Sequence, residues 1–368
     1  MSVMDLPFVP GLELSKLLFV EGVRPVMAAH FSALAYSAAR IDFGSDVLGF
    51  DTPQSRDHGW GPKLTLFVAE ENWAQCQAII DALGHCLPLT VGGYSTHFTD
   101  EGMESIPIEA IQRPIRHGVR VTTVARFFTD YVGFDPTLSI DEIDWLLAPP
   151  QRLRTIASGR VFHDGLGALD RARRALCWYP RDVWLYLMAN AWRRIDQEEP
   201  FMARCGDVGD ELGSRLIVAR QIDELMCLCF LIERQYWPYN KWFGTAFSRL
   251  VCAGNLMPVF QRVLDSPNWH EREKHLSGAY LIVGEMHNAL CLTPYIEPEI
   301  VPFYTRPYQV PHAARFCDAL HAEIASKTVQ SWPRDIGSVG QWANSTDVLE
   351  HIPLCQALGV IYKNGAGA

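Results

Sequence analysis

The residues best suited to chemistry lie in one short stretch, residues 44–59. Gly44 and Ser45, with Gly49 shortly after them, can form a tight turn in which backbone N–H groups and the serine hydroxyl donate hydrogen bonds to a phosphate. An ordinary turn from a strand into a helix explains the same residues equally well. The stretch therefore indicates a phosphate site without requiring one.

Three groups that could act as ligands follow the turn: Asp51, Asp57 and His58. If the chain is a regular strand here, positions 57 and 59 point to one face and His58 points to the other. Position 59 is glycine, so Asp57 has no second carboxylate beside it. One carboxylate usually leaves Mg²⁺ bound through substrate phosphates, which argues against a two-metal site. His58 is as suited to packing as to catalysis.

The stretch Gly44–Asp51 followed by Ser55–Pro62 resembles a bacterial family known as domain of unknown function 4037. That family is related to the nucleotidyltransferase superfamily of the DNA polymerase beta type. The resemblance continues through Ser158–Asp164, Trp178–Pro180 and Tyr236–Trp242, and so covers most of the chain.

The resemblance implies roles for the residues around the turn. Gly44 and Ser45 would cradle a nucleotide phosphate, and Asp57, with Asp51, would bind Mg²⁺. The chemistry of phosphoryl transfer suits such a set, because donors hold the phosphates that do not react and hard oxygen ligands hold the metal. Asp57 would then be a catalytic residue of this half of the chain, and His58 would join it in a hydrolytic alternative.

A third carboxylate is expected on the strand around residues 119–126, where the charged residues are instead Arg120 and Arg126. An arginine in that place can still hold a phosphate. The missing carboxylate therefore argues more strongly against catalysis than against nucleotide binding.

Further candidates lie later in the chain. Glu198 or Glu199 could deprotonate an acceptor hydroxyl, although solvent exposure at a helix end is the commoner fate of such residues. The aromatic segment Tyr236–Trp242 could stack a base on Tyr239 and place the ammonium of Lys241 on a phosphate, or could be ordinary core.

The elements that position these residues predict an α+β protein. A small mixed-sheet, nucleotidyltransferase-like domain with N-terminal helices is expected over residues 1–135, and a larger helical domain over residues 136–368. Alternating β-branched residues favour a strand that begins near Val119. Ser139 and Glu142 form a capping box that opens the helical part. Asp164 is expected to cap a following helix.

Composition narrows the possible classes. The chain has 368 residues, 48% hydrophobic and 20% charged, which describes a globular protein. A formal net charge of −10 argues against duplex nucleic acid as a partner. Ten cysteines without a CxxC pair, no signal sequence and no membrane-spanning stretch favour buried thiols in the cytoplasm. The oligomeric state is left open.

The leading functional hypothesis is transfer of a nucleoside monophosphate from an NTP to a small hydroxyl-bearing molecule, with Mg²⁺ as the cofactor. Gly44, Ser45, Lys241 and Tyr239 would bind the nucleotide, and Glu198 would be the base. Two alternatives stay open: a catalytically degenerate nucleotide- or metabolite-binding protein, and an enzyme that hydrolyses a nucleotide or nucleoside in the same pocket.

Overall fold

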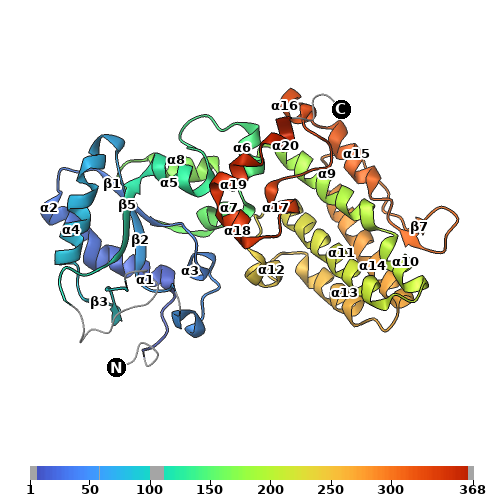
Figure 1. Cartoon of the computed structure of the whole chain (residues 1–368), viewed down its shortest axis with the longest axis horizontal. Coiled ribbons are helices and arrows are strands. Elements are labelled where there is room, and N and C mark those ends of the chain that lie inside the picture. The colour runs from blue at the N-terminus through green and yellow to red at the C-terminus, as the bar shows by residue number, and fades with distance from the viewer. Residues whose placement is uncertain (1–5, 58, 100–111, 364–368) are drawn as a thin grey trace. The chain divides into compact units, whose positions relative to one another are not determined.

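The computed structural model describes residues 6–57, 59–99 and 112–363 (Figure 1). The chain forms two compact units. The first unit comprises Met1–Ile140 and Gln151–Cys177, and the second comprises Asp141–Pro150 and Trp178–Ala368.

The first unit is built on a mixed sheet with the strand order β5-β2-β1-β6. The strands are β1 (Tyr36–Arg40), β2 (Lys63–Val68), β5 (Gly118–Thr123) and β6 (Arg160–Asp164). β1 runs antiparallel to β2 and β6, whereas β5 runs parallel to β2. The end of β1 therefore lies beside the beginnings of β2, β5 and β6, and the loops there share one edge of the sheet.

Short helices and one small hairpin complete this unit. They are α1 (Gly11–Leu17), the π-helix η2 (Leu18–Val23), α2 (Arg24–His30), α3 (Ser45–Leu48), the 3-10 helices η3 (Pro53–Asp57) and η4 (Glu70–Gln75), α4 (Cys76–Cys86), α5 (Val124–Val132), α7 (Pro150–Ser158), α8 (Ala168–Ala175), β3 (Thr90–Val91) and β4 (Tyr94–Ser95).

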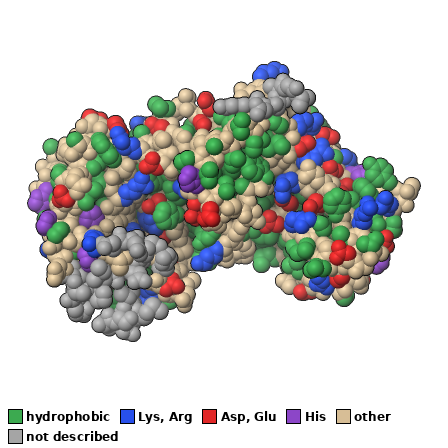
Figure 2. Space-filling model, in the orientation of Figure 1, with side chains coloured by type: hydrophobic (Ala, Val, Ile, Leu, Met, Phe, Trp, Pro, Cys, Tyr) green, Lys and Arg blue, Asp and Glu red, His purple; other side chains and the backbone are tan. Residues whose placement is uncertain are grey.

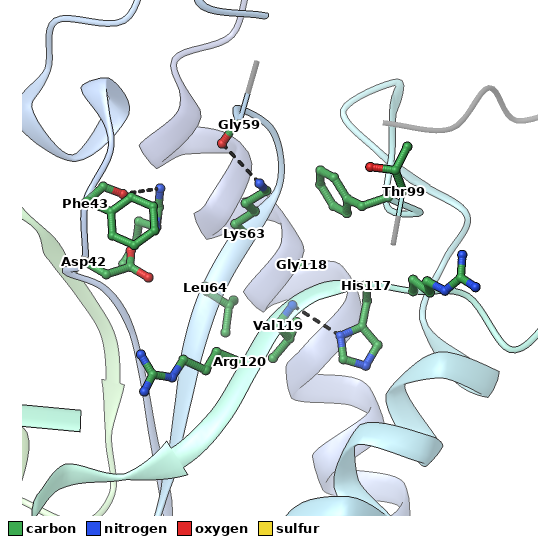
Figure 3. A pocket seen from close by; sticks show the side chains of 13 residues that line it. Asp42, Phe43, Gly59, Lys63, Leu64, Thr99, His117, Gly118, Val119 and Arg120 are labelled. Atoms are coloured by element: carbon green, nitrogen blue, oxygen red, sulfur yellow. Dashed lines mark hydrogen bonds and ion pairs between the residues drawn. The ribbon is translucent and has the colours of Figure 1, made fainter. Parts of the chain in front are cut away.

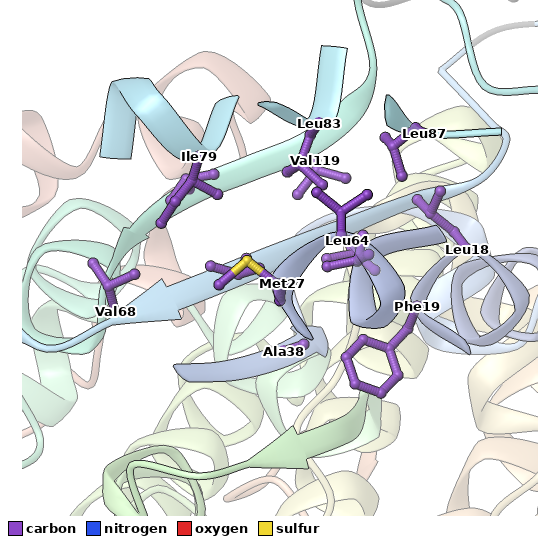
Figure 4. Close-up of a cluster of buried hydrophobic side chains, with 14 of the residues drawn as sticks. Leu18, Phe19, Met27, Ala38, Leu64, Val68, Ile79, Leu83, Leu87 and Val119 are labelled. Carbon is purple, nitrogen blue, oxygen red and sulfur yellow. The ribbon is translucent and has the colours of Figure 1, made fainter. Parts of the chain in front are cut away.

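One hydrophobic cluster of the first unit lies on the face of the sheet that carries α4 and the N-terminal helices. Leu64 and Val68 alternate along β2 toward this face. They pack with Ile79 of α4 and with Leu18 and Met27 of the N-terminal helices (Figure 4). Burying each such side chain contributes about 1.5–3 kcal/mol, so this layer holds the strands, and the edge where their ends meet, in place.

Residues 151–177 belong to the first unit because β6 completes its sheet, although the sequence grouped them with the helical domain. β6 has only five residues, too few for a clear alternation of apolar and polar side chains in the sequence. The predicted cap is confirmed, since Asp164 accepts hydrogen bonds from the backbone N–H groups of Gly167 and Asp170, both at 2.9 Å. Asp164 also accepts one from the Ser37 hydroxyl at 2.5 Å, which ties α8 to β1.

The second unit is helical apart from one two-stranded hairpin. Its elements are α6 (Glu142–Leu147), α9 (Arg181–Glu198), α10 (Phe201–Asp207), α11 (Glu211–Ile232), α12 (Asn240–Phe247), α13 (Ala253–Asp265), α14 (Trp269–Ala289), β7 (Val301–Pro302), β8 (Gln309–Val310), α15 (Ala314–Ala322), α16 (Lys327–Ser331), α17 (Val339–Trp342), α18 (Thr346–Glu350), α19 (Ile352–Ala357) and α20 (Val360–Lys363).

Helix α9 forms the centre of this unit. Trp192 is fully buried, stacks on Phe316 of α15 with ring centres 4.3 Å apart, and donates its indole N–H to His287 of α14 at 3.2 Å. The capping box of α6 is formed by Asp141 and Asp144, so the helix opens as predicted but with its cap shifted from Ser139.

The α+β fold class is confirmed, with a small mixed sheet in the N-terminal part and a larger helical part after it. Acidic and basic side chains are interspersed over the face that Figure 2 shows. Across the described part of the chain, the helices are all too short or too polar to cross a bilayer.

Candidate functional site

A pocket of about 360 Å³ opens at the edge where β1 ends and β2 and β5 begin. We call it the sheet-end pocket. Its basic side chains are Arg40, Lys63, Arg116 and Arg120, and among the described lining residues Asp42 is the one carboxylate. The remaining lining residues are Phe43, Gly59, Leu64, Phe98, Thr99, His117, Gly118 and Val119. The wall is therefore mainly cationic, with aromatic rings beside the charges.

Lys63, the first residue of β2, lies within this pocket. Its ammonium donates a hydrogen bond to the Gly59 carbonyl at 3.1 Å, and Asp42 and Phe43 lie to one side of it (Figure 3). Burial is the main cause that lowers the pKa of Lys63 to about 8, and the positive charge of Arg40 lowers it further. A depressed lysine pKa marks a place where an added negative charge would be favourable.

Arg40 braces the turn that leads out of β1. Its guanidinium is buried and donates to both carboxylate oxygens of Asp46, at 2.8 and 3.0 Å, and to the Phe43 carbonyl at 3.1 Å. It also pairs with Asp42. Such a two-pronged pair fixes geometry as well as charge, so the chain between β1 and α3 is held from inside.

Gly44 is required at this turn. Its φ is +149°, and a Cβ there would lie 2.1 Å from an Asp46 carboxylate oxygen and 2.7 Å from the Arg40 guanidinium. Ser45 then begins α3, as the predicted turn into a helix requires. Neither residue lines the sheet-end pocket among the described residues, and their phosphate contacts stay a prediction.

The expectation of a strand at Asp57 is wrong. Asp57 ends η3 and is exposed, and β2 begins only at Lys63. Gly59 has a left-handed φ of +68°, and Pro62 lacks the N–H that a strand ladder needs. The alternation that would place positions 57 and 59 on one face therefore does not apply. His58 lies outside the described residues.

Asp51 has a structural role in the first unit. One of its carboxylate oxygens accepts hydrogen bonds from the Gly11 backbone N–H at 2.7 Å and from the Trp60 indole N–H at 2.9 Å. This joins the start of α1 to the loop before β2. Among the residues that the structure describes, neither Asp51 nor Asp57 lines the sheet-end pocket, so the Mg²⁺ ligand set stays a prediction.

The other predicted site residues belong to the second unit. Glu198 ends α9 and pairs with Arg220 at 2.9 Å. Tyr239 precedes α12, and Lys241 in that helix lies 5.2 Å from the Trp242 ring centre. All the described lining residues of the sheet-end pocket belong to the first unit.

Sequence reasoning found one basic residue of the pocket, Arg120, and missed the basic residues Arg40, Lys63 and Arg116 and the acidic Asp42. Arg120 lines the pocket and pairs with Asp130 at 3.1 Å, a contact between exposed side chains that contributes little. Lys63 had a visible signal, since a lysine opens an otherwise apolar strand. Arg116 becomes relevant only once β5 pairs with β2.

A family model described as a domain of unknown function, DUF4037, matches residues 145–243. The match covers about a quarter of the chain and supports the resemblance to that family over those residues. The DUF4037 match includes the quoted motifs at Ser158–Asp164, Trp178–Pro180 and Tyr236–Trp242, which confirms the family resemblance. No curated protein and no solved structure matches the chain.

Proposed function

We propose that the first unit binds the phosphate groups of a nucleotide in the sheet-end pocket, on a fold related to the nucleotidyltransferases. The observation that carries the proposal is Lys63, a half-buried lysine with a lowered pKa in a pocket that also contains Arg116 and Arg120. Phosphate binding offsets the cost of keeping that ammonium charged. Arginine and lysine are the side chains best suited to phosphate recognition.

The aromatic residues of the pocket suit the rest of a nucleotide. Phe43 leaves 75% of its side chain exposed beside the cationic wall, and an exposed ring at that position can stack on a base. Stacking is tolerant of base identity. We therefore expect modest discrimination among nucleotides.

The described residues do not fit a metal held by the protein in this pocket. Its one carboxylate, Asp42, already pairs with Arg40, and the nearby side chains are positively charged. A cation would be repelled there more than it would be held. Nucleotide binding is thus expected without Mg²⁺.

Transfer of a nucleoside monophosphate to a small hydroxyl-bearing acceptor is the second candidate function. It is favoured by the Gly44–Ser45 turn directly after β1, the position that the resemblance implies for the phosphate turn. In this candidate Asp57 and the second-unit residues Glu198 and Lys241 keep their predicted roles. We expect the cytoplasm for either activity, because all ten cysteines are free thiols.

A thermal-shift panel separates the two candidates. The full chain is heated with each of the four NTPs, with Mg²⁺ or with a chelator. If the protein binds nucleotide without metal, stabilisation should persist in the chelator. It should reach about 2.7 kcal/mol at a nucleotide concentration a hundredfold above the dissociation constant. Stabilisation only with Mg²⁺ would favour the transferase, and no stabilisation by any nucleotide would overturn the proposal. A separate assay for nucleotide breakdown tests the hydrolytic alternative, because a product that forms without an acceptor would indicate hydrolysis.

A further inference from the structure

A second set of reactive side chains lies in the second unit, far in sequence from the residues that line the sheet-end pocket. Cys317 and His321 are four residues apart in α15, so their side chains share one face of the helix. Asp335 reaches them from the segment between α16 and α17. The thiol sulfur, one imidazole nitrogen and one carboxylate oxygen all lie within 4.8 Å of one another. We call these residues the three-ligand cluster.

Two of the three distances within the cluster match those around a tetrahedral metal ion, and the third, from sulfur to nitrogen, is at most 4.8 Å. The Cys317 Sγ lies 3.4 Å and the His321 Nε2 lies 3.3 Å from the same oxygen, Oδ1 of Asp335. Zinc–sulfur bonds of about 2.3 Å and zinc–nitrogen or zinc–oxygen bonds of about 2.0 Å, at tetrahedral angles, separate sulfur from oxygen by about 3.5 Å and nitrogen from oxygen by about 3.3 Å. The donors therefore need little movement to share one ion.

The surroundings orient the carboxylate toward the other two donors. Arg193 of α9 donates to Oδ2 of Asp335 at 3.1 Å and also pairs with Asp196 at 2.8 Å. This leaves Oδ1 to face Cys317 and His321. Outer contacts of this kind fix the orientation of metal ligands. The φ of Asp335 is +69°, a left-handed conformation that aspartate tolerates better than most residues.

Exposure and charge also suit an ion. Cys317 is fully buried, whereas the side chains of His321 and Asp335 are 13% and 24% exposed, so the cluster has one side open to water. A buried thiol behaves as a small apolar group and needs no carboxylate beside it. A thiolate and a carboxylate, together with a neutral imidazole, balance the two positive charges of a divalent ion.

We propose that Cys317, His321 and Asp335 bind one divalent transition-metal ion of the zinc class, with water in the fourth position. The ion replaces the thiol proton, which leaves to solvent. Thiolate and imidazole favour zinc over magnesium or calcium. The bound ion ties α15 to the segment before α17 and so stabilises the C-terminal part of the second unit. This site is independent of the nucleotide proposal.

Cobalt is the most direct probe, because Co²⁺ bound to a thiolate gives a charge-transfer absorption that aqueous Co²⁺ lacks. The full chain, treated with a chelator and with the exposed Cys86, Cys177 and Cys291 changed to serine, is titrated with Co²⁺ and then with Zn²⁺. We expect the band to saturate at one equivalent, to disappear when Zn²⁺ displaces the cobalt, and to accompany a rise in melting temperature.

Two variants and a matched control locate the ion. Cys317→Ser should abolish the band, and Asp335→Asn should weaken binding at least tenfold while asparagine keeps the left-handed backbone. Cys355→Ser is the control, because Cys355 is also buried but bonds to the Val348 carbonyl at 3.2 Å outside the cluster. It should leave the titration unchanged.

The absence of a thiolate band in the folded protein would overturn the proposal. So would a band that survives Cys317→Ser, or one that Cys355→Ser removes. If Cys317→Ser does not fold, Asp335→Asn decides the question, because an unchanged cobalt affinity in that variant excludes the cluster.

Discussion

The sheet-end pocket and the three-ligand cluster are opposite in charge. In the pocket, Lys63, Arg116 and Arg120 present positive charge around one carboxylate that is already paired. In the cluster, a thiol, an imidazole and a carboxylate converge, and the neighbouring Arg193 holds only the far carboxylate oxygen. The first arrangement favours an anion and the second favours a cation.

The comparison teaches that a motif and the chemistry it suggests can lie in different parts of a chain. The stretch around Gly44 and Asp57 suggests a metal-assisted reaction, yet the side chains best arranged as metal ligands are Cys317, His321 and Asp335. The cationic pocket of the first unit favours binding of the phosphate, and the described residues around it do not form a metal site. Separate variants can therefore remove one property and leave the other.

The largest expected effect is a loss in the free energy of unfolding when the Arg40–Asp46 pair beside the pocket is removed. Arg40→Met leaves Asp46, which is 5% exposed, without its two-pronged partner. Removing one member of a buried pair costs about 3–5 kcal/mol, and urea unfolding measures the loss. Arg160→Met is the control, because Arg160 pairs with Glu13 where both side chains are over 40% exposed, and it should cost less than about 1 kcal/mol. Equal losses would show that the Arg40 pair does not brace the turn.

The next effect tests the turn itself. Gly44→Ala forces a Cβ against Asp46 and a residue with a side chain into φ +149°, which should lower the free energy of unfolding by about 1–3 kcal/mol. Gly254→Ala in α13 is the matched change, since a Cβ there meets nothing within 4 Å, and it should stabilise by up to about 1 kcal/mol. Calorimetry of both variants would contradict the assignment if Gly44→Ala were neutral.

The fold class and the turn could be predicted because their signals are local. Gly44 and Ser45 mark a turn by residue type, and alternation marks the strand near Val119. The late start of β2 was missed because it depends on the left-handed φ of Gly59 and on Pro62. The strand pattern assumed regular backbone where the chain is irregular.

The two candidate sites could not be predicted as sites because each needs a long-range contact. Arg120 reaches Lys63's pocket only through the parallel pairing of β5 with β2. The spacing of Cys317 and His321 is visible in the sequence, but Asp335 joins them only through a left-handed residue in an irregular segment. The spacing of apolar residues along the sequence does not predict the pairing of β5 with β2 or the position of Asp335.

A change at Lys63 should weaken anion binding in the sheet-end pocket and leave metal binding by the three-ligand cluster unchanged. Lys63→Met should weaken nucleotide binding at least tenfold, or about 1.4 kcal/mol, measured by calorimetric titration. Lys16→Met, an exposed lysine of α1, should leave it unchanged. Neither variant should alter the cobalt titration of the three-ligand cluster. Equal nucleotide affinity in Lys63→Met and the parent would remove Lys63 from the site.

The smallest expected effect is a pH dependence that belongs to Lys63. Its folded-state pKa of about 8 lies below the ordinary lysine value of 10.5, so the charged form disfavours folding at neutral pH. Stability should therefore rise as the pH climbs from about 8 toward 10.5. The charged form is also the one that binds phosphate, so nucleotide affinity should fall several-fold as the pH rises through about 8.

The other cationic and imidazole groups among the described lining residues do not account for that fall. Burial lowers the pKa of His117, so this imidazole is already neutral above about pH 7, and the nucleotide phosphates complete their ionisation near pH 6 to 7. Arginine keeps its charge throughout. Lys63→Arg should therefore retain binding at about pH 7 and abolish the loss at about pH 9. An unchanged pH profile in Lys63→Arg would assign the titration to another group and leave Lys63 as a wall residue of the pocket.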